Sequence, residues 1–139
     1  MKQATTEIRF ETKGRGLFDV TAALGQWIDE HHIREGLFTA HIKHTSASLV
    51  IQENADPDVC YDLDNFLSRL VPENDPHFRH VAEGPDDMPA HIRAALTQSQ
   101  VSIPVIDGRL ALGTWQGIYI FEHRRRGHSR TLALHVLGD

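Results

Sequence analysis

The sequence predicts an α+β fold, and three observations lead to this class. The three segments with helical spacing of apolar residues all precede residue 100. The chain after residue 100 reads as a series of strands joined by short turns. No internal repeat, linker or low-complexity segment divides the 139 residues. Helices segregated from a run of antiparallel strands are typical of α+β proteins, and residues 1–139 are predicted to form one domain.

The N-terminal segment predicts a strand followed by a helix. Residues 4–11 alternate between apolar and polar side chains, which is typical of a strand with one face in water. Gly14 and Gly16 then turn the chain, and Asp19 stands where a helix N-cap is expected. Apolar residues at helical spacing follow, so residues 19–33 are predicted to form an amphipathic helix.

Two strands follow this helix, and each carries a polar residue on its apolar face. In the strand predicted over residues 36–44, a period of two places His44 on the inward face. In the strand predicted over residues 48–53, Glu53 shares a face with Leu49. Both polar side chains are therefore expected to point where apolar side chains point.

The second and third predicted helices flank a long irregular segment. Asp56 as N-cap and Pro57 at the first helical position begin a helix that continues to about residue 70. Its predicted apolar stripe is Val59, Cys60, Leu63, Phe66, Leu67 and Leu70. Residues 71–86 have no clean periodicity, and a loop of this length is often functional. The third helix is predicted from Asp87 to Gln98, with His91 on its buried side. Its predicted stripe is Met88, Ile92, Ala95 and Leu96.

The C-terminal part is predicted to be entirely β. Asp107-Gly108 is a strong signal for a two-residue hairpin turn. The expected strands cover residues 101–106, 109–112, 114–123 and 130–137, which gives about seven strands in all. The last two strands are apolar on both faces, which indicates burial on both sides by helices or by another chain.

Composition limits the classes of function. The net charge of −5 argues against a general nucleic-acid-binding protein, because such proteins carry a basic face. Cys60 is the only cysteine, so we expect no internal disulfide and a reducing compartment. No apolar run is long enough to cross a membrane, and the first residues lack the apolar core of a signal peptide. A cytoplasmic protein with no nucleic-acid or membrane partner is predicted.

Three histidines are placed to converge: His44 at an inward strand end, His80 in the long loop and His91 on a helix. Three neutral imidazoles with an open position are typical of a catalytic zinc site. The same side chains also suit general acid–base catalysis near neutral pH, or anion binding when protonated. Alternatively, each is a core histidine satisfied by one hydrogen bond.

Two further polar groups accompany the histidines. Glu53 lacks a structural reason for its inward position, so it is a candidate base or metal partner, whereas Asp56 is explained as an N-cap. In the string GTWQG, residues 113–117, glycines bracket a polar and aromatic centre, which often marks close approach of a ligand. The arginines at 124–126 and Arg130 are best explained as a solvated turn, although their guanidinium groups would suit a phosphate-bearing substrate.

The strings HTSAS, ENADPDV, FRHVAEGPDDMPAHI and DGRLALGTWQGIYIFE resemble the YjbQ family, described as secondary thiamine-phosphate synthases. The similarity covers residues 5–137. It implies an α+β domain that assembles as a homotrimer with sites near subunit interfaces. The polar positions typical of the family are His44, Glu53, Asn54, Asp56, His80, Glu83, Asp87, His91, Thr114, Gln116 and Glu122.

These considerations assign three sets of candidate residues. The expected catalytic residues are His44, Glu53, Asp56 and Glu83, and the expected metal ligands are His44, His80 and His91. The expected substrate-binding residues are Asn54, Thr114, Gln116 and Arg130.

Three hypotheses of function follow. The first is an enzyme that joins a pyrimidine-methyl diphosphate to a thiazole phosphate, making thiamine phosphate with a divalent metal. Magnesium is the usual companion of diphosphate, whereas histidines suit zinc. The second is a non-catalytic homotrimer that binds a metal or small ligand, and the third is a metal-assisted hydrolase. Each expects a small, phosphorylated ligand or a metal as the partner.

Overall fold

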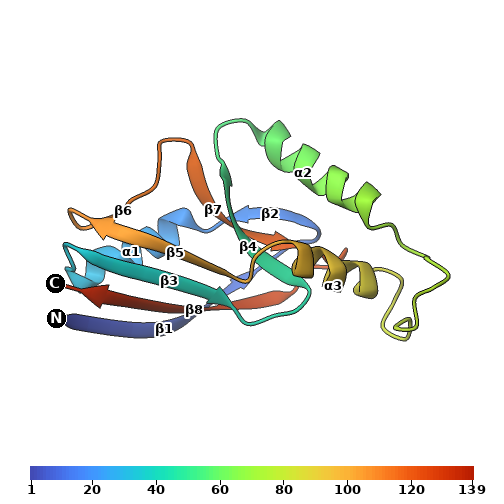
Figure 1. Cartoon of the computed structure of the whole chain (residues 1–139), viewed down its shortest axis with the longest axis horizontal. Coiled ribbons are helices and arrows are strands. Elements are labelled where there is room, and N and C mark those ends of the chain that lie inside the picture. The colour runs from blue at the N-terminus through green and yellow to red at the C-terminus, as the bar shows by residue number, and fades with distance from the viewer.

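A computed structural model describes residues 1–139 and confirms the α+β class (Figure 1). Three helices and eight strands follow one another as β1 (Lys2–Glu11), β2 (Gly16–Asp19), α1 (Thr21–His31), β3 (Gly36–Ile42), β4 (Ala47–Glu53), α2 (Pro57–Leu70), α3 (Asp87–Leu96), β5 (Gln100–Ile106), β6 (Arg109–Leu110), β7 (Gln116–Glu122) and β8 (Ser129–Gly138). No helix combines the length and hydropathy that a membrane crossing requires.

Two antiparallel sheets share one hydrophobic core with α1. The larger sheet has the strand order β1-β8-β3-β5-β6, and the smaller has the order β2-β7-β4. Leu24 and Ile28 of α1 lie in the same buried cluster as Phe38 of the larger sheet and Leu49 of the smaller. The apolar periodicity of each strand is thus satisfied by the opposite sheet or by α1, as expected for packed layers.

Local sequence signals fix two of the predicted boundaries. The β5–β6 hairpin pairs Ile106 with Arg109, and both turn residues, Asp107 and Gly108, have positive φ. The hairpin is therefore confirmed, with the backbone that an Asp-Gly turn favours. At the start of α2, the Asp56 side chain accepts a hydrogen bond from the Asp58 N–H at 2.9 Å, which confirms the predicted N-cap.

The N-terminal prediction was wrong in one respect, because a short strand precedes α1. Gly16–Asp19 forms β2 and pairs with β7, far along the chain. Asp19 is consequently the last residue of a strand and not the N-cap, although its carboxylate accepts the Thr21 N–H at 2.9 Å. Eight strands result, where about seven were predicted.

The stripe predicted for α2 is only partly covered, since Val59, Cys60, Leu63 and Leu67 are half-buried, and the stripe predicted for α3 is not the face that this helix buries. No residue of α2 is fully buried, and Tyr61, Phe66 and Leu70 are exposed. On α3 the buried residues are Asp87, Pro89, Ala90 and Arg93, whereas Leu96 lies in solvent. The reason on α3 is polar pairing, because Arg93 donates a hydrogen bond to the His123 carbonyl at 2.7 Å.

Of the two strands predicted to be apolar on both faces, β7 is covered within the chain, whereas one face of β8 is only half-buried and ends in the exposed Leu137. In β7, Ile118, Tyr119, Ile120 and Phe121 are all buried. The strand ends in Glu122, whose fully buried carboxylate accepts hydrogen bonds from Arg130 Nε at 2.8 Å and from Thr12 Oγ1 at 2.6 Å. Burial alone would raise the pKa of Glu122, but these hydrogen bonds hold it below its ordinary value.

Candidate functional site

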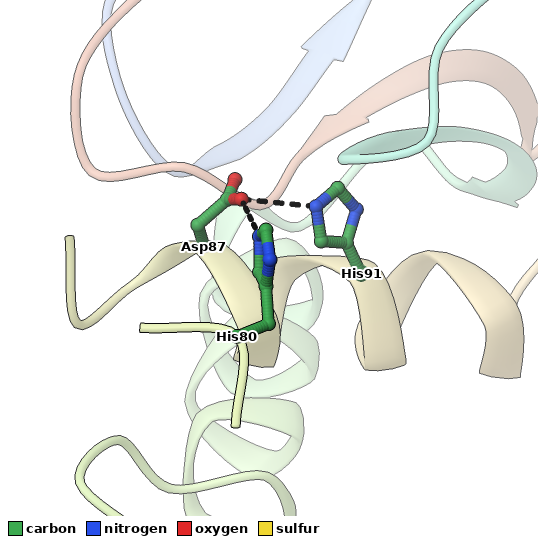
Figure 2. A group of neighbouring side chains, drawn as sticks. All are labelled: His80, Asp87 and His91. Atoms are coloured by element: carbon green, nitrogen blue, oxygen red, sulfur yellow. Dashed lines mark hydrogen bonds and ion pairs between the residues drawn. The ribbon is translucent and has the colours of Figure 1, made fainter. Parts of the chain in front are cut away.

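Two imidazoles converge on one carboxylate at the start of α3 (Figure 2). Asp87 and His91 lie one turn apart on the helix, and His80 comes from the loop that precedes it. The Asp87 Oδ2 atom lies 2.6 Å from His80 Nε2 and 3.0 Å from His91 Nε2. The Asp87 side chain is only 4% exposed, whereas both imidazoles are open to solvent on one side. We call this group the His80–Asp87–His91 cluster.

A backbone contact fixes the orientation of His91. Its Nδ1 lies 2.8 Å from the carbonyl oxygen of Thr45, which can only accept a hydrogen bond. Nδ1 therefore carries the hydrogen, and in the neutral ring Nε2 presents a lone pair. That lone pair faces a carboxylate oxygen, so the contact requires either a second proton on the ring or a cation between the two atoms.

Arg124 holds the other side of the same carboxylate. Its Nη1 lies 2.8 Å from Asp87 Oδ1, and its Nε donates to Asp86 Oδ2 at 3.0 Å. Burial opposes ionisation of Asp87, but His80, His91 and Arg124 together lower its pKa. Burial likewise opposes ionisation of Asp86, but Arg124 and the Arg125 N–H lower its pKa to about 2. The carboxylate of Asp87 is thus oriented and ionised before any ligand binds.

The depressed pKa of Asp86 predicts a pH-dependent contribution to stability. An Asp86→Asn variant should lose about 2 kcal/mol at pH 7, because a folded pKa below the ordinary value stabilises the ionised state. This contribution is complete above about pH 4 and disappears as the pH falls toward 2, so the two proteins should converge there. Urea unfolding at pH 7, 4 and 2.5 measures the difference.

Asp107→Asn provides the matched control for this measurement. Asp107 also pairs with an arginine, Arg34, but both side chains are more than 70% exposed. Exposed pairs contribute little, so the control should change stability by less than about 1 kcal/mol at every pH. A loss at Asp86 that is equal at pH 7 and pH 2.5 would contradict the assigned cause.

The donor set of the cluster fits a divalent metal. One ligand atom from each residue lies within 4.8 Å of the other two. Ligands about 2.0–2.1 Å from a tetrahedral zinc are roughly 3.3 Å apart, so a small outward movement of both imidazoles would accommodate the ion. Two histidines and one carboxylate leave a fourth position open, as in catalytic zinc sites. The His91–Thr45 and Asp87–Arg124 contacts are the supporting interactions that such ligands usually have.

His44 adjoins the cluster but does not belong to it. Its Nε2 accepts the Thr131 N–H at 2.8 Å, and Asp87 takes the third place that was predicted for His44. Burial, followed by the charge of Arg130, lowers the pKa of His44, so the ring is neutral. His44 lines a cavity of about 550 Å³, which we call the His44 recess. The recess is formed by His44, Thr45, Ala47, His91, Ala94, Ala95, Thr97 and Ser99.

The predicted residues of the ENAD and GTWQG strings come together elsewhere. Asn54 donates its backbone N–H to the Trp115 carbonyl at 3.0 Å, and its side chain lies near the Gln116 carbonyl. Glu53 accepts the N–H groups of Ala55 and Asp56 at 3.1 and 3.0 Å. Thr114 is exposed in the same loop. The carboxylate of Glu53 therefore caps a turn, and the expectation that it lies beside the imidazoles is not met.

Glu53, Asn54 and Asp56 line a separate cavity with Leu17, Pro57, Cys60 and Tyr119. This second cavity and the His44 recess share no residue. They lie at opposite ends of β4, because His44 precedes this strand and Glu53 is its last residue. Within one chain, the structure thus brings His80 and His91 together and separates them from the carboxylates expected to assist them.

The structure also places two more of the predicted site residues, Arg130 and Glu83, outside the His80–Asp87–His91 cluster. Arg130 was expected to contact substrate, but its guanidinium is buried against Glu122 and also donates to Ser46 Oγ at 2.9 Å. These contacts engage Nε and Nη2, whereas Nη1 has no hydrogen-bond partner in the protein, so the expected substrate contact stays a prediction. Glu83 is exposed, and its carbonyl, not its carboxylate, accepts a hydrogen bond from Arg124 at 3.2 Å.

Asp87 and Arg124 complete the site but were missing from the predicted ligands and substrate contacts. The spacing of Asp87 and His91 on a predicted helix was an available signal, because residues four apart share a face. For Arg124 the sequence offers no such signal, since only the fold brings the turn after β7 to the start of α3.

The sequence is similar to one protein family along nearly its whole length. The family model described as UPF0047 protein YjbQ-like matches residues 6–139. A UPF0047 protein of Synechocystis is 49% identical over 92% of this chain and 87% of its own. The UPF0047 protein YjbQ of Escherichia coli O157:H7 is 40% identical over 95% of this chain and 96% of its own.

Solved structures show the same fold. A structure from Clostridium acetobutylicum, described as an uncharacterized conserved protein of the yjbq/upf0047 family, has a TM-score of 0.87 at 33% identity. It is matched over 95% of this chain and 99% of that chain. A YbjQ-like protein of unknown function from Sulfolobus solfataricus has a TM-score of 0.90 at 22% identity, covering 99% of both chains. The latter likeness concerns the fold alone.

Proposed function

The chain belongs to the YjbQ-like UPF0047 family, and from the site that its residues build we propose a divalent-metal protein acting on a phosphorylated small molecule. His80, Asp87 and His91 would hold the ion. Zinc suits this set better than magnesium, because two of the three ligands are imidazoles. The fourth position would receive an oxygen of the substrate.

The observation that carries the proposal is the direction of the His91 hydrogen bond. Nδ1 donates to the Thr45 carbonyl, and Nε2 is turned toward an ionised carboxylate at 3.0 Å. The same two contacts would serve a doubly protonated ring in an ion pair, so they support a metal only together with the geometry of the three donor atoms. In a metal site, the Thr45 contact keeps the hydrogen on Nδ1 and leaves Nε2 unprotonated and aimed at the ion.

Charge balance favours an anionic ligand. Two neutral imidazoles and one carboxylate leave a bound divalent cation with a net charge of +1. Arg124 does not alter this sum, because Asp86 balances it at 3.0 Å. When bound, the metal supplies Lewis acidity to a phosphate oxygen. Arg124 would keep Asp87 ionised and oriented, and Thr45 would hold His91 in place.

The family resemblance directs the choice of first substrates. A pyrimidine-methyl diphosphate and a thiazole phosphate, supplied together, would give thiamine phosphate and diphosphate if the protein is the transferase that the resemblance implies. Phosphate release from either compound alone would identify a hydrolase. Metal binding without turnover would identify the non-catalytic alternative.

Untagged protein should bind one zinc ion per chain at neutral pH. Calorimetric titration against a competing chelator gives the stoichiometry and affinity. Repeating the titration in buffers of different ionisation enthalpy measures proton release, which we expect because zinc displaces any proton shared by the imidazoles and Asp87. Cobalt(II) substitution should give the strong visible absorption of a four-coordinate site.

Failure to bind zinc saturably would overturn the proposal. Stoichiometric binding without proton release would contradict the second proton that the His91–Asp87 contact requires in the metal-free protein, while the metal site itself would stand. A His41→Ala/His135→Ala variant tests whether surface histidines contribute to the zinc binding. Its two histidines line a different depression of the larger sheet, so it should bind zinc as the parent protein does.

A further inference from the structure

We infer that the His44 recess binds the uncharged, hydrogen-bond-accepting end of a ligand whose anionic end is held at the His80–Asp87–His91 cluster. The inference rests on the proposed metal site and names the class of ligand that this site accepts. It also gives His44 a role in specificity, in place of metal ligation.

Position is the first argument. His91 belongs to both features, because its Nε2 faces Asp87 and its ring lines the recess. A ligand bound at the cluster therefore has the recess as its immediate neighbour. At about 550 Å³, the recess is large enough for a ring-sized group, since ligand cavities commonly measure roughly 300–1,000 Å³.

The second argument is the hydrogen-bonding state of His44. Its Nε2 accepts the Thr131 N–H, so in the neutral ring the hydrogen is on Nδ1. No group of the protein accepts a hydrogen bond from that nitrogen, and it is not among the buried polar atoms that lack a partner. The Nδ1–H is thus an accessible donor without a protein partner, on a ring that lines the recess.

The remaining lining restricts the chemistry of the ligand. Ala47, Ala94 and Ala95 supply small apolar surfaces, and no lysine, arginine, aspartate or glutamate lines the recess. Thr45 and Ser99 add hydroxyl groups with no hydrogen-bond partner in the protein. An environment of neutral donors on an apolar floor suits a flat group with a ring nitrogen or carbonyl acceptor. A charged group there would lose hydration without compensation.

Three hydroxamates bound to the zinc-loaded protein test this inference. Acetohydroxamate reaches the metal alone, benzohydroxamate adds a ring, and pyridine-4-carbohydroxamate adds a ring with one acceptor. We expect benzohydroxamate to bind more tightly than acetohydroxamate, and the pyridine compound to bind about three- to ten-fold more tightly than benzohydroxamate. In His44→Phe the two ring compounds should become equal.

A second variant protects the test against misfolding of His44→Phe. Ala94→Leu fills the recess from α3, so it should remove the advantage of both ring compounds while acetohydroxamate still binds. Ala111→Leu makes the same change at an exposed residue outside the recess and should leave all three affinities unchanged.

The outcomes separate this inference from the proposed function. If zinc and acetohydroxamate bind but the ring compounds bind no more tightly, the role of the recess is refuted and the metal site stands. The same holds if the ring compounds keep their higher affinity in Ala94→Leu. A persistent preference for the pyridine compound in His44→Phe would overturn the role of His44. Absence of zinc binding would overturn both.

Discussion

Replacing Arg130 with methionine should destabilise the protein by about 3–5 kcal/mol, because it leaves Glu122 buried and ionised without its partner. The Glu122 side chain is fully buried, and the Arg130 side chain is 4% exposed. Arg130 also satisfies Ser46, so its loss removes several hydrogen bonds at once. Urea unfolding at pH 7 measures the change.

Two further variants show whether the cause is the unpaired charge. Adding Glu122→Gln to Arg130→Met should recover part of the loss, because the amide removes the buried charge and can still accept from Thr12. Lys43→Met breaks the exposed Lys43–Glu7 pair and should change stability by less than about 1 kcal/mol. Similar losses in Arg130→Met and Lys43→Met would refute the explanation.

Removing both imidazoles of the cluster should abolish stoichiometric zinc binding. In His80→Ala/His91→Ala only Asp87 remains, and one carboxylate facing Arg124 is not a zinc site. We expect the affinity to fall by more than about a hundred-fold, on the scale of free energies for structural zinc. Zinc titration and metal content after dialysis measure the effect.

The folded state should largely survive this double substitution. Both imidazoles are partly exposed, and the substitution removes their contacts with Asp87 and the hydrogen bond from His91 to the Thr45 carbonyl, while Arg124 still pairs with Asp87. The unfolding free energy without metal should therefore fall by no more than about 2 kcal/mol. Asp87→Asn provides an intermediate, because it keeps both imidazoles and removes the charge. Undiminished zinc binding by the double variant would place the metal elsewhere.

Most of the architecture was predictable because it depends on local patterns. The alternation of β1, the Asp107-Gly108 turn and the Asp56-Pro57 helix start each have a physical cause within a few residues. The strand β2 escaped prediction because it has four residues and exists by pairing with β7, about a hundred positions later. The buried face of α3 was wrongly assigned because hydrophobic periodicity ignores polar side chains that are buried in pairs, such as Arg93.

The residues of the candidate site also differ in whether local sequence could identify them. His80 and His91 were identified as candidate ligands from composition and position, and the structure places them around one carboxylate. Glu53 and His44 could have been separated from the sequence, because a strand rises roughly 3.3 Å per residue and β4 therefore spans about 20 Å between them. The buried ion pair of Arg130 with Glu122 could not have been predicted from the sequence, since it depends on how closely β7 and β8 approach each other.

The weak packing of α2 against the rest of the protein has a consequence for local unfolding. No side chain of α2 is fully buried, and none belongs to the buried core cluster. Detachment of α2 would therefore leave the core between the two sheets intact. The cost of detaching it is lower than the cost of global unfolding, and Tyr61 and Phe66 already present an exposed aromatic surface to other molecules while the helix is docked. A binding partner that covers this surface would stabilise the docked state of α2. The fraction of molecules with α2 detached would then depend on the concentration of that partner.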